Sequence, residues 1–321
     1  MMLKKTFAAV ITFLCLMSGT VLAHHAPVVT GTSQAGPVLT TSAATLQKGR
    51  LALTLQASYV NMDDFSDNEL HGFAEQGNDV HTFDYLYSIS AVAAYGITDD
   101  LTLSLRVPYK SIDNIREAHG DEPDEIHRHG DSDGIGDMTL LAHYRFLKIP
   151  ARQLESTVIF GIKVPTGQTD EEDIHGERFE TEHQPGSGSW DPMIGVAVTK
   201  RIERICLDAG LRYTLATEGS QDTDLGDMLS YDFAFSYNIP GKIVLDLVLE
   251  ANGEWKQKEE IDGSKDENSG GHILYLSPGM RIRLNNALSA FISVGIPVIQ
   301  DMNGIQSDTN FRTLFGISFV L

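Results

Sequence analysis

Hydrophobic and polar residues alternate along most of this chain. In residues 50–61, for example, Leu51, Leu53, Leu55 and Tyr59 are apolar or aromatic, and the residues between them are small or polar. A period of two puts successive side chains on opposite faces and predicts a β-strand. Twelve such segments recur, at about residues 50–61, 81–97, 101–112, 135–146, 154–165, 190–201, 205–217, 227–239, 242–255, 272–284, 287–298 and 309–321.

Short turns and long loops alternate between these segments. The tight turns lie near residues 98–100, 148–152, 202–204, 240–241 and 285–286. The long connections span residues 62–80, 113–134, 166–189, 218–226, 257–271 and 299–308. This alternation is typical of an outer-membrane barrel with short periplasmic turns and long extracellular loops. An even number of strands then leaves both chain ends on the periplasmic side.

The two faces of the segments differ in kind. Phe233, Phe235 and Tyr237 share one face, opposite Asp232 and Ser236. In a soluble barrel, such aromatic rows from twelve strands would crowd a single interior, whereas in a membrane barrel they face lipid. We therefore predict an all-β fold, a transmembrane up-and-down antiparallel β-barrel of about 12 strands.

Both ends of the chain support export to the outer membrane. Lys4 and Lys5 precede an apolar stretch and small residues up to Ala23, as in a cleaved secretory signal peptide. We expect residues 1–23 to be this signal peptide, 24–48 an N-terminal periplasmic or lumenal segment, and 49–321 the barrel. The last strand ends with apolar residues at alternate positions and is expected to be recognised by the barrel-assembly machinery.

The charge is concentrated in the loops. The chain has 24 Lys and Arg against 44 Asp and Glu, a net charge of −20. The six long connections hold 31 of the acids and only five bases, by count. This acid excess argues against nucleic acid as a partner. We expect acidic extracellular loops beside outer-membrane lipid and lipopolysaccharide.

The polar faces of the strands carry charges of both signs. The candidate lumen-lining residues are Arg50, Asp84, Arg106, Lys110, Asp137, His143, Arg145, Lys163, Arg212, Asp232, Asp246, Glu250, Arg281, Arg283 and Arg312. Two interpretations stay open: a water-filled pathway with charged walls, or an ion-paired lumen that holds the barrel shut. Twelve strands lie between the filled eight-stranded barrels and the open porins of about sixteen or more, so the barrel size favours some passage.

The loop at 113–134 combines imidazoles with carboxylates, which suit divalent cations. The candidate metal ligands are His119, His127, His129, Asp131 and Asp133. The alternative is a solvated acidic loop beside divalent-bridged lipopolysaccharide. We expect no cofactor other than divalent cations at the surface.

We expect no enzyme. A barrel hydrolase needs a serine or aspartate paired with histidine near the outer rim. His81, His143 and His272 lie in or beside strands, but no Ser–His–acid set can be assembled around them from the pattern.

Several short motifs, in order, carry a family resemblance. They are Ala-Tyr-Gly-Ile-Thr-Asp-Asp at 94–100, Arg-Val-Pro-Tyr at 106–109, Gly-Ile-Gly-Asp-Met at 134–138, Lys-Val-Pro-Thr-Gly at 163–167 and Gly-Ile-Pro-Val at 295–298. The chain, from about residue 45 to its end, resembles the outer-membrane family named for the meta-cleavage pathway of phenol degradation. The resemblance implies an outer-membrane channel or transporter and supplies no catalytic residues.

The sequence therefore predicts passive passage of a small molecule, with hydrophobic or aromatic solutes foremost. The alternative function is a non-conducting surface barrel whose acidic, His-containing loops bind divalent metal ions or cationic partners.

Overall fold

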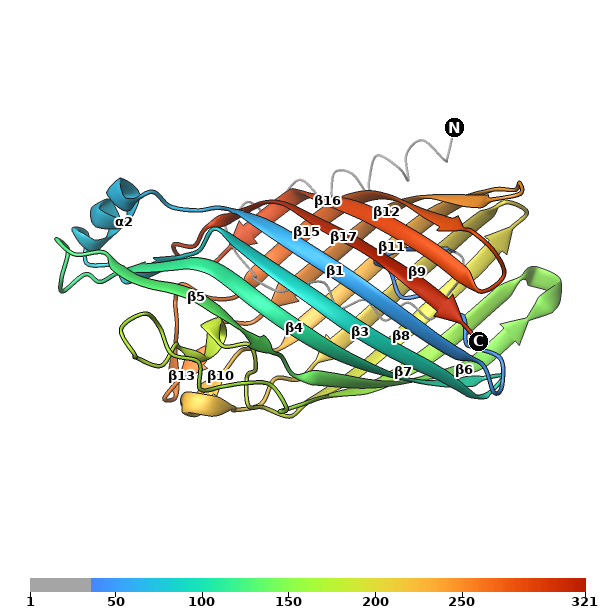
Figure 1. Cartoon of the computed structure of the whole chain (residues 1–321), viewed down its shortest axis with the longest axis horizontal. Helices are drawn as coiled ribbons and strands as arrows, with labels where there is room; N and C mark the ends of the chain where they lie inside the picture. Colours follow the sequence, from blue (N-terminus) through green and yellow to red (C-terminus); the bar gives the residue numbers. More distant parts are fainter. Residues whose placement is uncertain (1–35) are drawn as a thin grey trace, which may run out of the picture.

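In the computed structural model, which describes residues 36–321, twelve long antiparallel strands close into a barrel (Figure 1). Each strand pairs with its neighbours in sequence, and the last pairs with the first. At that seam the Leu321 N–H donates to the Leu51 carbonyl at 2.8 Å. The predicted barrel is confirmed.

The barrel strands follow the alternating segments closely. They are β1 (Leu51–Asp63), β3 (Tyr85–Thr98), β4 (Leu101–Ala118), β6 (Met138–Ile149), β7 (Leu154–Val164), β8 (Asp191–Ile202), β9 (Ile205–Thr214), β11 (Met228–Ile239), β12 (Val244–Lys256), β15 (Gly271–Arg283), β16 (Leu288–Met302) and β17 (Asp308–Val320).

The apolar faces point outward. Phe233 is 51% exposed on β11, and Phe315 is 52% exposed on β17. The intervening Ser236 and Ser318 are buried on the lumen side. Because the pleat alternates, each outward row of Leu, Ile, Phe and Tyr leaves an inward row, in which Ser, Thr and charged residues mix with apolar ones such as Val248 and Leu314.

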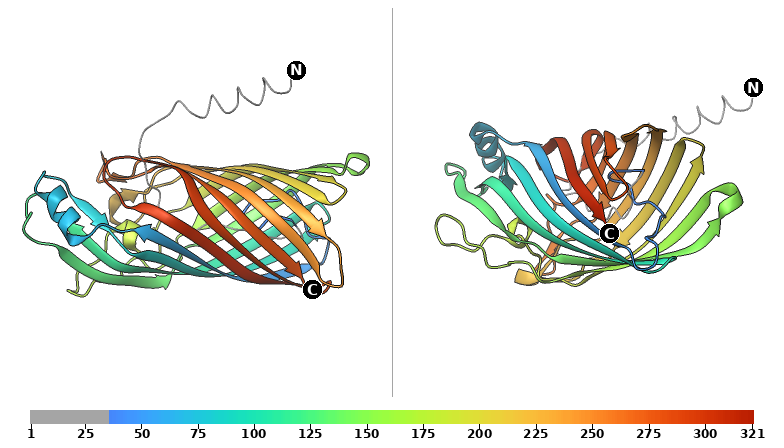
Figure 2. Two further views of the ribbon diagram at one scale, coloured as in Figure 1. Left: turned by 90° about the horizontal axis from the view of Figure 1, so that it is seen from above. Right: turned by 45° about the vertical axis from the view of Figure 1, so that its right-hand side comes forward.

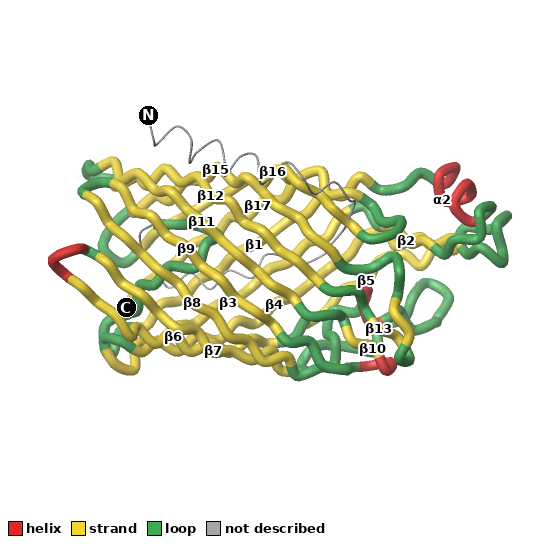
Figure 3. Tube along the Cα trace, turned by 180° about the vertical axis from the view of Figure 1, so that it is seen from behind, coloured by secondary structure: helices red, strands yellow, loops and turns green. Residues whose placement is uncertain are grey.

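The long connections gather at one end of the barrel and the tight turns at the other (Figure 3). The loop end carries the helix α2 (Asp67–Ala74), the strands β2 (Val80–Thr82) and β5 (His127–Ile135), and the short strands β10 (Thr223–Asp224), β13 (Glu260–Ile261) and β14 (Ser264–Lys265). It also carries the 3₁₀ turns η2 (Thr181–His183) and η3 (Ser220–Asp222), whereas η1 (Pro150–Arg152) lies at the turn end. Within residues 36–321, no helix is long and apolar enough to cross a membrane.

The connection 113–134 is more ordered than the sequence predicts. β4 continues to Ala118, and β5 returns alongside it. The pairing register shifts between Ile112 and Ile115, and Asn114 between them has φ +57°. Such a bulge changes which face a side chain takes, so it breaks the period-two signal even though the strand goes on.

We predict a depth-dependent cost of charge on the outer face. Phe233→Arg, at mid-strand, should lower the free energy of unfolding by about 2–4 kcal/mol, because a charge at the bilayer midplane is poorly solvated. Denaturant titration of barrels refolded into lipid vesicles measures this. Tyr237→Arg, nearer the turn end of the same face, is the matched control and should cost about 0–1 kcal/mol for the charge. Equal costs at the two depths would contradict the outward placement.

Candidate functional site

Residues 36–46 run inside the barrel, and the exposed residues 47–50 lead from them to β1 (the dark blue trace in Figure 2, right). Val38 and Leu39 are buried against Val248, Phe291 and Leu314 of the wall strands. Further along, residues of the segment contact the interiors of β6, β7 and β8. This lumenal segment, residues 36–46, therefore occupies the lumen toward the turn end.

Glu250 and Arg281 hold the lumenal segment from adjacent strands, β12 and β15. The Glu250 carboxylate accepts hydrogen bonds from the backbone N–H groups of Val38, Leu39 and Thr40 at 2.8–3.2 Å. The Arg281 guanidinium donates to the Pro37 carbonyl at 2.8 Å. Glu250 has no exposed surface. Glu250 thus accepts from three backbone N–H groups of the segment, and Arg281 donates to one of its carbonyl oxygens.

Threonine hydroxyls on other strands hold the rest of the segment. Thr199 Oγ1 accepts from the Ala43 N–H at 2.8 Å, and Thr157 Oγ1 donates to the Ala43 carbonyl at 2.6 Å. Thr102 Oγ1 accepts from the Leu46 N–H at 2.8 Å. These bonds replace the ladder partners that an extended chain would have in a sheet, so the backbone groups of Ala43 and the N–H of Leu46 are satisfied. Nothing in the sequence distinguishes a threonine that bonds the lumenal segment from any other lumen-facing threonine of a strand.

The connection 166–189 folds inward at the opposite, extracellular end. Asp137 anchors its base: one carboxylate oxygen accepts from the N–H groups of Thr166 and Gly167 at 3.1 and 2.9 Å. The other oxygen accepts from the N–H and hydroxyl of Ser187, both at 2.8 Å. A Cβ on Gly167 would lie 2.6 Å from the Cα of Gly186, so the two ends of the loop touch backbone to backbone.

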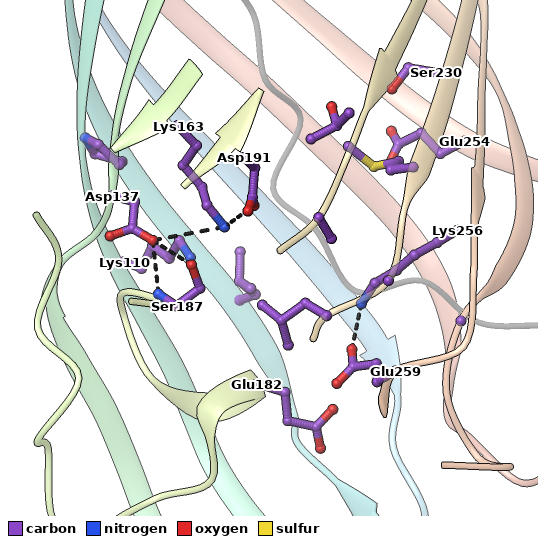
Figure 4. Close-up of a pocket in the computed structure, with 18 of the residues that line it drawn as sticks. Lys110, Asp137, Lys163, Glu182, Ser187, Asp191, Ser230, Glu254, Lys256 and Glu259 are labelled. Carbon is purple, nitrogen blue, oxygen red and sulfur yellow. Dashed lines mark hydrogen bonds and ion pairs between the residues drawn. The ribbon is translucent and has the colours of Figure 1, made fainter. Parts of the chain in front are cut away.

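A cavity of about 210 Å³ lies between the lumenal segment and this loop. Leu39 of the lumenal segment lines it. Glu182 and Ser187 reach it from the loop (Figure 4). Its wall carries six basic and six acidic residues: Arg106, Lys110, Lys163, Arg212, Lys256, Arg312, Asp137, Glu182, Asp191, Asp232, Glu254 and Glu259. Apolar side chains such as Phe83, Leu86 and Met193 line the remainder.

Ion pairs neutralise part of that wall. Lys163 pairs with Asp191, and Lys256 pairs with Glu259 at 2.5 Å (Figure 4). Arg312 pairs with Glu254 at 2.9 Å.

Three bases on the wall remain outside these pairs. Within residues 36–321, no carboxylate oxygen lies within 4.0 Å of the charged nitrogens of Arg106, Lys110 or Arg212. Arg106 and Lys110 come from β4 and Arg212 from β9, with three strands between them round the wall, and Asp232 on β11 is an acid that also lacks an ion pair in this part of the chain.

The structure places most of the expected lumen residues inside the barrel. Seven line the cavity: Arg106, Lys110, Asp137, Lys163, Arg212, Asp232 and Arg312. Five others lie on lumen-facing positions away from the cavity: His143, Asp246, Glu250, Arg281 and Arg283.

Three residues lie elsewhere. Arg50 is exposed at the turn end, ahead of β1. Asp84 lies at the loop end, bonded to Asn114 at 2.9 Å, because the strand expected at 81–97 breaks between β2 and β3. Arg145 faces inward but is held at the periplasmic rim by Asp100 at 2.7 Å.

Three of the five expected metal ligands lie close together: the ring centroids of His119 and His127 are 5.0 Å apart, and those of His127 and His129 are 6.4 Å apart. His119 lies with Asp79 and Asp121, whereas His127 lies with Glu122 and Glu125. The pairing of β5 with β4 sets His127 opposite Glu117, whose carboxylate lies 3.4 Å from His129 and 3.7 Å from His119. A loop sequence alone does not reveal such pairing.

Asp131, Asp133 and His129 have protein partners. Asp131 accepts from the Asn114 N–H at 2.9 Å, and Asp133 accepts from the Tyr109 hydroxyl. A hydrogen bond to Glu117, with a second to Asp173, raises the pKa of His129 to about 9. Both ring nitrogens of His129 thus face protein carboxylates, Nδ1 that of Asp173 and Nε2 that of Glu117.

Comparisons with known proteins give a family match. The family model described as "Putative MetA-pathway of phenol degradation" matches residues 62–299. No curated protein matches the sequence significantly.

Solved structures share the fold. The COG4313 outer membrane channel from Pseudomonas putida F1 is 17% identical, with a TM-score of 0.61 over 87% of this chain and 97% of that one. The translocator domain of the autotransporter NalP from Neisseria meningitidis is 10% identical, with a TM-score of 0.44 over 85% and 89%. The CymD monoaromatic hydrocarbon channel is 9% identical, with a TM-score of 0.43 over 86% and 89%. At these identities the first comparison shows the barrel fold, and the other two add nothing to it.

We predict that Asp137 keeps the inward loop closed. Asp137→Ala removes the acceptor for Thr166, Gly167 and Ser187, and hydrogen bonds to a charged group contribute about 1.5–3 kcal/mol each. Trypsin should then cleave after the exposed Arg178 at least roughly tenfold faster, since about 1.4 kcal/mol already changes an opening equilibrium tenfold. Asp133→Ala, which removes an exposed carboxylate on β5, should leave the cleavage rate unchanged. Equal rates for wild type and Asp137→Ala would contradict this role.

Proposed function

Because this chain belongs to the family described as "Putative MetA-pathway of phenol degradation" and closes into a transmembrane barrel, we propose that it passes a small molecule through the outer membrane. The observation that carries the proposal is the cavity of about 210 Å³ inside the lumen. A barrel that serves only as a scaffold has no need of such a space, since side chains fill small barrels completely.

The cavity volume suits a small organic solute. In another protein, an engineered apolar cavity of about 150 Å³ holds benzene. The space here is larger, at about 210 Å³, so it has room for one ring and a small substituent. Phe83, Leu86 and Met193 offer an apolar surface for such a body.

The charge on the wall favours an anionic group on the solute. Arg106, Lys110 and Arg212 point to the cavity without a carboxylate partner within 4.0 Å. Buried charges are screened much less than surface charges, and the Debye length is about 8 Å in physiological salt. The acidic outer loops therefore act less on these three bases than the wall acids Asp137 and Asp232 do. We infer a solute with an apolar body and an anionic group.

The lumenal segment is the barrier on the periplasmic side. Its contacts with Glu250, Arg281 and three threonines close the lumen below the cavity. Passage then requires this segment to shift, and Glu250 is the residue whose bonds must break. The proposed pathway is a gated one.

Several expectations remain predictions. They are cleavage of residues 1–23, which lie outside the described part of the chain, contact with lipopolysaccharide and the assembly machinery, and the lack of enzymatic activity. A non-conducting barrel whose loops bind cations is the alternative function. It would be favoured if no variant below conducts.

We predict that Glu250→Ala raises conductance. Loss of the carboxylate leaves three N–H groups of the lumenal segment without their acceptor, at about 1.5–3 kcal/mol for each charge-assisted bond. Planar-bilayer recordings should show larger or more frequent openings than the wild type. Asp246→Ala is the control, since it removes a neighbouring buried acid of β12 that bonds Asn238 and not the segment. No flux or channel events in either protein would reject the transport proposal.

We predict anion preference from the basic wall. In the Glu250→Ala background, the reversal potential under a KCl gradient should favour chloride. Adding Arg106→Gln and Arg212→Gln should shift it toward potassium, because two positive charges leave the cavity. Lys258→Gln, which alters a loop base paired with Glu267, should not move the reversal potential. A cation-selective parent, or no shift in the double variant, would contradict the inferred solute charge.

A further inference from the structure

Three potential metal ligands meet where the cavity opens toward the loops. His81 comes from β2, and Glu182 and His183 come from η2. Glu182 Oε1 lies 3.1 Å from His81 Nε2 and 3.8 Å from His183 Nε2. The two imidazole rings stand edge to face with centroids 4.8 Å apart. All three residues also line the cavity.

The spacing is close to that of a metal centre. One ligand atom from each residue lies within 4.8 Å of the others. In a tetrahedral zinc site with bonds of about 2.0–2.1 Å, ligand atoms stand roughly 3.3 Å apart. Small rotations of the His183 and His81 side chains would therefore bring the set to bonding distance. Two imidazoles with one carboxylate suit Zn²⁺ and neighbouring divalent transition metals, and leave a fourth position open.

The backbone that carries the three residues is well fixed. His81 stands opposite Glu117 in the β2–β4 pair, and the next residue, Thr82, bonds Ser307 at 2.6 Å. On the loop, Ser132 donates to the His183 carbonyl at 2.6 Å. Rigid support of this kind lowers the entropy cost of gathering ligands from separate segments.

The surroundings of the three residues are acidic. Glu117, Glu180 and Asp266 act electrostatically on His81, and Glu259 acts on Glu182. The nearby base Lys256 is itself paired with Glu259 at 2.5 Å. A cation placed among His81, Glu182 and His183 would therefore gain attraction from several carboxylates.

The other loop groups are weaker candidates. His119 lies with Asp79 and Asp121, and His127 lies with Glu122 and Glu125. Each group has a single imidazole, and its carboxylates are exposed. Exposed carboxylates are well solvated and favour hard cations only weakly.

We propose that His81, Glu182 and His183 form a binding site for a divalent transition metal, of the Zn²⁺ type, at the extracellular mouth. A bound ion would link β2 to the loop 166–189 above the cavity. The site does not depend on solute passage, so it can be tested whether or not the barrel conducts.

The test is a calorimetric titration, in which ZnSO₄ is added to metal-stripped, folded protein in detergent and the heat of binding is measured. The wild type should bind one equivalent at micromolar concentration. His81→Ala, His183→Ala and Glu182→Gln should each weaken binding at least about 100-fold, since even partners outside the coordination shell are worth roughly 10- to 100-fold. Co²⁺ should give visible absorption typical of low coordination number, and the three variants should lose it.

Two controls separate this site from general binding to acidic loops. His127→Ala removes an imidazole of the neighbouring connection 113–134, and His175→Ala removes one of the connection 166–189 that carries Glu182 and His183. Both should leave the affinity unchanged. Heat-dependent migration on gels checks that every variant keeps a folded barrel. The proposal is overturned if the wild type shows no saturable heat, if His81→Ala and His183→Ala bind as the wild type does, or if His127→Ala alone abolishes binding.

Discussion

Hydrogen bonding of the backbone in lipid is the constraint on which this structure depends. Hydrocarbon offers no partners for N–H and C=O groups, so a sheet that crosses the membrane must have no open edge. Here the pairing of β17 with β1 removes that edge, down to the reciprocal bonds between Leu51 and Leu321. Once the sheet is closed, the pleat sends alternate side chains to lipid and to the lumen. The polar lumen is thus a consequence of closure.

A polar lumen must in turn satisfy its own buried groups, because unpaired polar atoms are costly away from water. The chain does this with its own backbone at both ends. Glu250 and Arg281 hold the lumenal segment from one pair of strands, and Asp137 holds the loop 166–189. The two initial interpretations, an open pathway and an ion-paired lumen, therefore apply to different positions along the axis of one barrel. Packed segments and ion pairs occupy its ends, and a cavity remains between them.

The acidic charge of the protein acts at two levels. Most of it lies in extracellular connections, where salt screens it and carboxylates are solvated. Inside, acids and bases are equal in number along the cavity, and the ion pairs among the described residues leave Arg106, Lys110 and Arg212 without a close carboxylate and Asp232 without a close base. The histidines of the loop end also differ in their partners. His129 is bonded to two carboxylates, whereas His81 and His183 face each other across Glu182.

The sequence by itself determined the barrel, the number of its strands, the outward faces and the end at which the loops lie. It could do so because alternate residues of each strand face lipid and lumen and are apolar or polar accordingly, as in Phe233 beside Asp232. It also indicated the lumen side of Glu250, Arg281 and the cavity residues, because those positions follow from parity alone. Only the tertiary structure decided what these residues contact. The bonds from Glu250 to residues 38–40 and the meeting of His81 with His183 join positions about 100 to 210 residues apart in the chain. The alternation of apolar and polar residues assigns each side chain to the lipid or the lumen face. It does not identify which distant segment that side chain contacts.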